Sequence, residues 1–371
     1  MNYSLGEFYR EEDIVAEDSI CRWGLMGTAG IGRKNWQAIK LSGNGQVKAV
    51  ASRSLARSQS YIDECQAATP FPQSPQAVEG YENLLNSEDI EAIYIPLPTG
   101  IRKQWVIRAA QAGKHVLCEK PCAANADDLA EMIEACKSNN VQFMDGVMFM
   151  HSQRLQAVKK ALDEIGELRR ITTHFSFHGG QEFAKSNIRT NSELEPLGCL
   201  GDLGWYSIRF ALWIMNYQKP VRVVGRILNQ LQREDCAHSV PIEFAGELHF
   251  EGGVTSSFYN SFETGFEQWA QISGTKGNIS IHDFVNPFAG PSIKFQLRQP
   301  NKSVEPGNFA VVENGQTVVV EEPGSSGPLS QETNLFRNFG SLVLSGEVDD
   351  HWPTIALQTQ QVVDACFSSA S

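Results

Sequence analysis

Three side chains capable of acid–base chemistry stand in two short motifs of this sequence. Lys120 follows the apolar run in GKHVLCEKP, at the carboxyl end of an expected strand, and Pro121 turns the chain directly after it. Asp202 and Tyr206 lie four residues apart in GCLGDLGWY, a spacing that puts both side chains on one face of a helix. We expect the lysine to point into a crevice at the edge of a sheet.

An ammonium and a phenol form a useful acid–base pair when they are close together. A free tyrosine has a pKa near 10, which is too high for a good base at neutral pH. Lowering it to about 8 needs roughly 2.7 kcal/mol, and an ammonium ~4 Å away supplies about 4 kcal/mol at an effective dielectric of 20. We therefore expect Lys120, if it is close, to lower the pKa of Tyr206 enough for proton exchange with an alcohol.

A glycine-rich turn separates the first expected strand from the first expected helix. In this turn Gly27 and Gly32 fill the first and third positions of the G-x-G-x-x-G dinucleotide fingerprint, and Ala29 replaces the second glycine. Backbone N–H groups at such a helix N-terminus can hold a pyrophosphate. The residues expected to bind a dinucleotide here are Gly27, Thr28, Ala29, Gly30, Ile31 and Gly32.

The end of the second expected strand indicates which dinucleotide is bound. NAD enzymes usually place an acidic residue there for the ribose 2′-OH, but this chain has Ser52 followed by Arg53. A guanidinium fork suits a phosphate, and Arg57 lies one helical turn further on. We therefore expect NADP rather than NAD, with these three residues near its phosphate.

These motifs sit within a regular alternation of strands and helices in residues 21–147. The expected strands are 21–27, 46–52, 90–95, 115–119 and 141–145, and the expected helices are 31–41, 54–67, 81–86, 101–112 and 126–139. The alternation predicts an α/β fold, with a parallel sheet, helices on both faces and ligands at the carboxyl ends of the strands. This is a Rossmann dinucleotide-binding domain.

Residues 148–371 follow a different pattern and predict a C-terminal α+β domain for substrate binding and oligomerisation. In 171–178 the side chains alternate, with Ile171 and Phe175 on one face and His174 and His178 on the other. This period predicts a large, mostly antiparallel open sheet. Further strands are expected at 220–228, 242–251, 254–262, 267–273 and 278–284, and helices at 153–163, 331–346 and 353–369. Segment 285–330 is rich in Pro and Gly and is the hardest part to interpret, so its elements stay open here.

Composition narrows the functional classes. The 371 residues carry a net charge of −12 without a basic stripe, which argues against a nucleic-acid partner. The eight cysteines are scattered without a C-x-x-C pair, so we expect reduced thiols and a cytoplasmic protein. His174 and His178 would lie about 13 Å apart on a strand, so no metal site is expected. Residues 1–20 predict an acidic arm without the pattern of a secretory signal, and no membrane span is expected.

Longer segments resemble the glucose–fructose oxidoreductase family, also called Gfo/Idh/MocA. The resembling segments are the glycine loop, IYIPLPTGIRKQW (93–105), AGKHVLCEKP (112–121), MDGVMFMH (144–151), NIRTNSELEPLGCLGDLGWY (187–206) and GTKGNISI (274–281). The Asp-x-Gly-x-Tyr form is similar to the branch that holds D-xylose dehydrogenases, dimeric dihydrodiol dehydrogenase and plant oxidoreductases. Two positions depart from the family pattern, since Arg102 replaces a common histidine and Gly198-Cys199 replaces Gly-Gly.

The resemblance implies a role for each candidate residue. Lys120 would lie beside the nicotinamide and the reacting carbon, and Tyr206 would donate or accept the proton. Asp202 would hold the substrate or orient its neighbours, and Arg189 would lie near the substrate. The residues expected to line the cofactor are Pro96, Leu97, Pro98, Thr99, Glu119 and Lys120.

These observations lead us to expect an NADP-dependent oxidoreductase that transfers a hydride between the nicotinamide and a sugar, polyol or cyclic alcohol. His178 would either touch the substrate at the edge of the sheet or serve only the fold. One alternative is a redox-neutral lyase or glycosidase with tightly bound NAD(P). The other is a non-catalytic NAD(P)-binding sensor or regulator, which should lack Lys120 or Tyr206. As in the family, a homodimer or homotetramer through the C-terminal sheet is expected.

Overall fold

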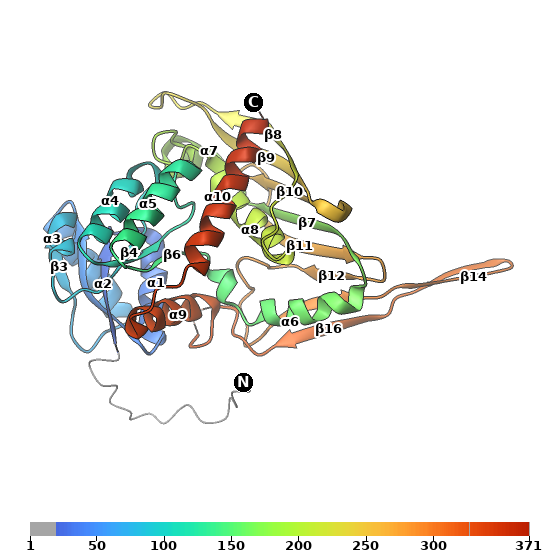
Figure 1. Cartoon of the computed structure of the whole chain (residues 1–371), viewed down its shortest axis with the longest axis horizontal. Helices are drawn as coiled ribbons and strands as arrows, with labels where there is room; N and C mark the ends of the chain where they lie inside the picture. Colours follow the sequence, from blue (N-terminus) through green and yellow to red (C-terminus); the bar gives the residue numbers. More distant parts are fainter. Residues whose placement is uncertain (1–19, 326, 371) are drawn as a thin grey trace.

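The computed structural model describes residues 20–325 and 327–370 of the chain. Nearly all of the expected acidic arm, residues 1–19, therefore lies outside the described residues. No helix within the described ranges is long and apolar enough to cross a membrane. The molecule is built on two sheets, drawn at the left and the right of Figure 1.

The first sheet has six parallel strands in the order β3-β2-β1-β4-β5-β6, which is the doubly wound arrangement expected of a dinucleotide-binding domain. Its strands are β1 (Cys21–Met26), β2 (Gly45–Ser52), β3 (Gln76–Glu79), β4 (Ala92–Ile95), β5 (His115–Cys118) and β6 (Phe143–Asp145). The helices between them are α1 (Gly30–Leu41), α2 (Leu55–Ala68), α3 (Tyr81–Leu85), α4 (Thr99–Gln111) and α5 (Ala126–Ser138). The expected α/β class is confirmed.

Both faces of this sheet are covered, because alternate residues of its strands enter two separate apolar clusters. Trp23 and Tyr94 belong to one cluster, whereas Met26 and Ile93 belong to the other. The first cluster also contains α9 (Gln331–Ser345), and the ring of Phe336 lies 5.2 Å from that of Trp23. A helix expected in the C-terminal domain therefore packs on the nucleotide-binding sheet, and the division at residue 147 stays a prediction.

The second sheet has eight strands in the order β16-β13-β12-β11-β7-β10-β9-β8. They are β7 (Leu168–Ser176), β8 (Arg222–Leu231), β9 (Val240–His249), β10 (Thr255–Ser261), β11 (Glu267–Gly274), β12 (Asn278–Ile281), β13 (Ile293–Arg298) and β16 (Gly315–Val320). Every pairing is antiparallel except that of β7 with β10, so the expected mostly antiparallel sheet is confirmed.

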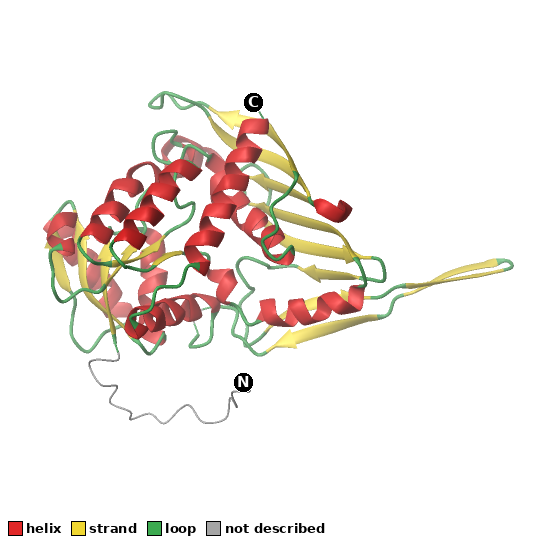
Figure 2. Ribbon diagram, viewed as in Figure 1, coloured by secondary structure: helices red, strands yellow, loops and turns green. Residues whose placement is uncertain are grey.

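The two faces of the second sheet differ, as the alternation predicted. Ile171 and Phe175 of β7 are buried on the face that α8 (Trp205–Ile214) contacts, and α10 (His351–Ser369) packs against α8 and the edge strand β8 (Figure 2). The opposite face carries His174, whose ring packs against those of Tyr259 and Trp269. The use of that face for oligomerisation stays a prediction.

Segment 285–330, whose elements the sequence leaves open, contains regular structure. It supplies β13 and β16, and between them β14 (Asn301–Glu305) and β15 (Asn308–Val312) pair as a two-stranded ribbon. The ribbon projects from the edge of the sheet (Figure 1).

A buried ion pair joins the two sheets directly behind the crevice. Arg209 of α8 donates from Nη2 to Oδ2 of Asp145, the last residue of β6, at 2.6 Å, and neither side chain is exposed. Trp205 Nε1 donates to the same carboxylate oxygen at 3.3 Å. All residues of α8 are buried, and the ion pair joins this helix to the carboxyl end of β6.

Candidate active site

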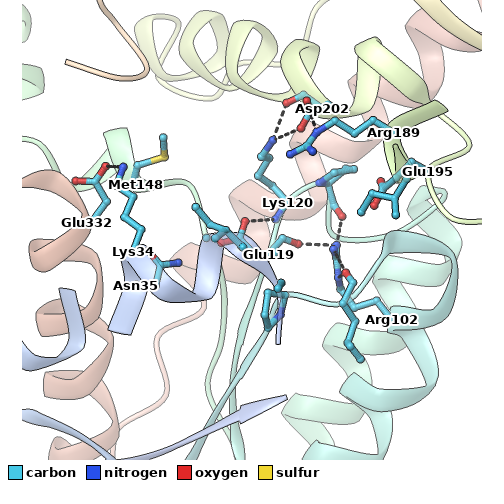
Figure 3. Close-up of a pocket in the computed structure, with 18 of the residues that line it drawn as sticks. Lys34, Asn35, Arg102, Glu119, Lys120, Met148, Arg189, Glu195, Asp202 and Glu332 are labelled. Atoms are coloured by element: carbon cyan, nitrogen blue, oxygen red, sulfur yellow. Dashed lines mark hydrogen bonds and ion pairs between the residues drawn. The ribbon is translucent and has the colours of Figure 1, made fainter. Parts of the chain in front are cut away.

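A cavity of about 330 Å³ lies where the carboxyl ends of β1, β4, β5 and β6 meet the loop that leads into α8 (Figure 3). Ten of the residues expected at the site line it, namely Ala29, Gly30, Ile31, Pro96, Leu97, Glu119, Lys120, Arg189, Asp202 and Tyr206. The others, which do not line it, are Gly27, Thr28, Gly32, Ser52, Arg53, Arg57, Pro98, Thr99 and His178. The cavity thus unites the two chemical motifs with the glycine loop.

Asp202 is the centre of a charge network at the cavity wall. Its Oδ1 accepts a hydrogen bond from Lys120 Nζ at 2.7 Å, and its Oδ2 accepts one from Arg189 Nε at 2.7 Å. Lys120 Nζ also donates to the backbone oxygen of Asp202 at 2.8 Å. The side chains of Lys120 and Asp202 are 9% and 10% exposed, so both charges are largely withdrawn from water. The trio carries one net positive charge next to the cavity.

Tyr206 lies beside this network, as the acid–base argument requires. The ammonium of Lys120 is 4.5 Å from the centre of the Tyr206 ring, and the phenol donates to Met148 Sδ at 3.7 Å. Burial nevertheless raises the pKa of Tyr206 to about 12, and the opposing effect of Lys120 is smaller. The expected lowering of this pKa is therefore wrong for the protein alone, because the ring is desolvated and the carboxylates of Glu119 and Asp202 oppose the ammonium.

The motif around Asp202 folds differently from a regular helix. Residues Leu200–Gly204 form one turn of π-helix before α8 begins at Trp205, so Asp202 and Tyr206 are not simply stacked on one α-helical face. The preceding Gly198 has φ +48°, and a Cβ on it would lie 2.1 Å from the backbone oxygen of Pro241. This turn depends on a residue without a side chain and delivers both groups to the cavity.

The glycine loop offers a site for the phosphates of a dinucleotide. α1 begins at Gly30 without a side-chain cap, and Gly30 and Ile31, whose N–H groups have no partner within the helix, line the cavity; the N–H of Gly32 donates to the backbone oxygen of Ala29 at 3.1 Å. A Cβ on Gly30 would meet no heavy atom within 4 Å. Gly32 serves packing instead, because a Cβ there would approach the hydroxyl of Tyr61 to 2.5 Å. These residues fit a nicotinamide dinucleotide.

The arginines expected near an additional phosphate lie outside the cavity. Arg53 and Arg57 are exposed, and their side chains make no hydrogen bond or ion pair within residues 20–325 and 327–370. Both act electrostatically on Tyr81. Burial raises the pKa of Tyr81, and the two guanidinium groups partly oppose that rise. Ser52 is buried, and its hydroxyl donates to the backbone oxygen of Ser54 at 2.6 Å. The turn after β2 therefore presents two available cations to solvent.

Several lining residues had no signal in the sequence motifs. Lys34 of α1 and Glu332 of α9 form an ion pair of 2.5 Å across the cavity, and they come from opposite ends of the chain. Glu119 accepts a hydrogen bond from the hydroxyl of Tyr94 at 2.6 Å, and the same hydroxyl accepts one from Asn35. Gly146, Met148, Ile188 and Glu195 also line the cavity; they lie in segments that carry the family resemblance but were not assigned to the site, whereas Asn286 and Leu335 lie outside those segments.

His178 lies outside the lining of this cavity, so its role stays a prediction. β7 ends at Ser176, and His178 is exposed beyond the end of the strand and outside the cavity lining. The described ranges contain no group of three His, Cys, Asp or Glu residues that could hold a metal ion.

A parallel sheet with an uncapped glycine turn at its carboxyl edge, next to a paired lysine and tyrosine, defines a nucleotide-dependent oxidoreductase. Residues 21–147 match the oxidoreductase family with an NAD-binding Rossmann fold, and residues 155–280 match the C-terminal domain of the same family. The chain belongs to the Gfo/Idh/MocA oxidoreductases and is an NAD(P)-dependent dehydrogenase or reductase acting on CH–OH groups. The resemblance seen in the motifs is confirmed.

Individual relatives show the range of activities around this chain. D-xylose 1-dehydrogenase (NADP(+)) 2 of Haloferax volcanii is 31% identical over 265 residues, which cover 71% of this chain and 76% of that protein. Trans-1,2-dihydrobenzene-1,2-diol dehydrogenase of Mus musculus is 30% identical over 274 residues, 72% of this chain and 76% of that protein. The crystal structure of KijD10, a 3-ketoreductase from Actinomadura kijaniata in complex with NADP and TDP-benzene, superposes with a TM-score of 0.77 at 25% identity, covering 94% and 98% of the two chains.

Proposed function

We propose that this protein is an NADP-dependent oxidoreductase that interconverts an alcohol and a carbonyl on a sugar, polyol or cyclic alcohol. The observation that carries the proposal is the contact between Lys120 and Tyr206 at 4.5 Å, next to the N-terminus of α1. A sensor without chemistry would have no need for a buried ammonium held against a phenol.

The proposed mechanism divides the work between two side chains. A bound nicotinamide would supply or accept the hydride. Lys120, oriented by Asp202 at 2.7 Å, would donate a hydrogen bond to the substrate oxygen and stabilise the negative charge that develops there. Tyr206 would exchange the proton of that oxygen. Because the pKa of Tyr206 is about 12, the phenol holds its proton at neutral pH and is set to act as a donor in carbonyl reduction.

Arg53 and Arg57 support the preference for NADP. Both are exposed cations at the end of β2, where the adenosine ribose of a dinucleotide lies in this fold. No acidic residue stands at that strand end to bind a free 2′-OH. The named cofactor of the xylose dehydrogenase relative is also NADP(+), and KijD10 was crystallised with NADP.

The cavity walls favour a substrate rich in hydroxyl groups. Asp202 and Arg189 present hydrogen-bonding groups on the side away from the glycine loop, and the guanidinium is 40% exposed. Relatives at 30% and 31% identity act on a diol and on D-xylose, which are of the same chemical class. We also propose that the protein assembles as a homodimer or homotetramer through the open face of the second sheet.

A substrate panel tests this function. The purified protein is mixed with NADP⁺ and a set of aldoses, polyols and cyclic diols, or with NADPH and the matching carbonyl compounds, while the absorbance of the reduced cofactor is followed. We expect at least one compound to change the absorbance at a rate proportional to enzyme. A protein that binds NADPH by fluorescence titration but never changes its redox state with any of them would contradict the proposal.

A further inference from the structure

Arg102 is a buried arginine in the first turn of α4. Its guanidinium lies between the loop after β4 and the turn after β5, both of which line the active site. The side chain is 3% exposed. Nε donates to the backbone oxygen of Leu97 at 2.9 Å, and Nη2 donates to the same oxygen. Nη1 donates to the backbone oxygen of Glu119 at 2.7 Å and also to that of Pro121. One guanidinium thus ties the loop after β4 to the turn after β5.

The two acceptors in the second loop lie on either side of the catalytic lysine. Glu119 precedes Lys120 and Pro121 follows it, so Arg102 holds the backbone before and after this residue (Figure 3). At the other end of the side chain, Asp202 holds the ammonium at 2.7 Å. Lys120 is therefore held at its backbone by Arg102 and at its ammonium by Asp202. These contacts direct the side chain toward Tyr206.

The guanidinium of Arg102 donates hydrogen bonds to these backbone carbonyl groups and forms no ion pair with a described residue. Within the described ranges no carboxylate lies within 4 Å of its guanidinium, and the carboxylate that responds to it electrostatically is Glu195. Burial raises the pKa of Glu195 and Arg102 opposes that rise. Glu195 in turn accepts from Thr99 N at 3.1 Å and from Thr99 Oγ1 at 2.6 Å, at the N-terminus of α4.

The first turn of α4 therefore also fastens the loop that carries Arg189. Besides the bonds to Glu195, Gly100 N donates to the backbone oxygen of Leu194 at 2.9 Å. A Cβ on Gly100 would lie 1.8 Å from the backbone oxygen of Glu193, so the loop rests directly on this glycine. Three loops that contribute to the cavity converge on one helical turn, with Arg102 at its centre.

We propose that Arg102 is a positioning residue that fixes the direction of Lys120 toward Tyr206 and the substrate. This inference rests on the proposed function and adds to it a residue that lies behind the reacting groups. Arginine suits the task because its planar fork presents donors in two directions at once, which a single ammonium does not. A displacement of about 1 Å at the reacting atoms can cost on the order of 10²-fold in rate.

Arg154 provides the matched control. It is also a buried arginine, 2% exposed, and it donates to Asp283 Oδ1 at 2.6 Å and to the backbone oxygen of Asp283 at 2.7 Å. It does not line the cavity. Replacing it by methionine removes a buried guanidinium, here one paired with a carboxylate, without touching the two loops.

The experiment compares Arg102→Met, Arg102→Lys and Arg154→Met by two readouts. The first is hydrogen exchange of the backbone amides of Glu119, Lys120 and Cys122, since Pro121 has no N–H, measured on the protein without cofactor. The second is kcat and KM for the substrate found with the wild type. We expect Arg102→Met to speed the exchange about tenfold and to lower kcat about 100-fold with little change in KM. Arg102→Lys should lie between Arg102→Met and the wild type in both readouts, and Arg154→Met should match the wild type at residues 119–122.

The two readouts separate this inference from the proposed function. Unchanged exchange at residues 119–122 in both Arg102 variants would overturn it, as would normal kcat together with fast exchange. If Arg102→Met does not fold, Arg102→Lys alone decides by the same criteria. A wild type without turnover on any substrate, combined with fast exchange only in the Arg102 variants, would support the role of Arg102 in holding the backbone around Lys120 and count against the proposed function.

Discussion

Replacing Asp202 by asparagine is the perturbation whose size the structure defines best. Burial alone would raise the pKa of Asp202, but Arg189 and Lys120 together hold it at about 2, below the ordinary 3.8. A depression of that size corresponds to about 2.5 kcal/mol of interaction with the charged form. Asparagine keeps the shape of the side chain and removes this charge, so the variant should lose about that amount of folding stability at pH 7.

The loss should depend on pH in a defined direction. The pKa of Asp202 is lower in the folded than in the unfolded chain, so its stabilisation is fully present above about pH 4 and is lost as the pH falls toward 2. The difference between wild type and Asp202→Asn should therefore be constant between pH 5 and 8 and shrink below pH 4. At pH 7 it corresponds to a melting temperature lower by about 3 °C for a chain of this length.

Chemical denaturation at several pH values measures this difference. Asp235→Asn is the control, because Asp235 pairs with Arg233 on the surface and its side chain is 61% exposed. We expect no measurable change in stability for the control. An Asp202→Asn protein as stable as the wild type at pH 7, or one whose deficit persists undiminished at pH 3, would refute the charge network as described.

The same substitution should move the pH profile of catalysis. Asp202 raises the pKa of both Tyr206 and Lys120. Without its charge both groups lose their protons at lower pH, so the alkaline limb of kcat for carbonyl reduction should shift to lower pH. A limb that stays in place or moves upward would show that neither group controls the reaction.

Three further substitutions test separate parts of the site. Tyr206→Phe should lower kcat by ~10²–10⁴-fold while NADPH binding is retained, and an unchanged kcat would remove Tyr206 from the proton transfer. Arg53→Ala should weaken NADP binding about tenfold by fluorescence titration and leave NAD binding unchanged; equal effects on both cofactors would contradict its role. Gly100→Ala should raise the substrate KM, because its Cβ would meet the backbone oxygen of Glu193 at 1.8 Å, whereas Gly265→Ala, with no heavy atom within 4 Å, should not.

The nucleotide-binding sheet was accessible from the sequence because its strands are short apolar runs bounded by glycine or proline. The strands in the segments CRWGLMG and IEAIYI are almost entirely buried, as a sheet covered on both faces requires. β3 escaped prediction because none of its four residues is fully buried. Such a strand is held by its pairing with β2 rather than by its own apolar pattern.

The last third of the second sheet was harder to predict. β13 does alternate, with Ile293, Phe295 and Leu297 buried, but it stands among prolines and glycines that obscure the pattern. The helix at residues 331–345 was expected, whereas its position on the first sheet was not. Its Phe336 packs against Trp23 over a separation of more than three hundred residues, and local patterns carry no information about such a contact.

The site shows the same division between local and long-range information. Lys120, Asp202 and Tyr206 were identified from their motifs, and the fold brings them together. The pKa of Tyr206 was misjudged because the calculation counted one ammonium and neither the burial of the ring nor the neutralising carboxylate. Glu332 had no motif, since it reaches the cavity only through the packing of α9.

The most direct test of the central claim is the activity of Lys120→Met on a substrate of the wild type. This variant keeps an unbranched side chain one atom shorter and removes the ammonium that contacts Asp202 and Tyr206. The account predicts NADPH affinity close to that of the wild type and no measurable hydride transfer by the absorbance of the reduced cofactor. Turnover within a few-fold of the wild type would contradict the assignment of this cavity as an active site built on Lys120.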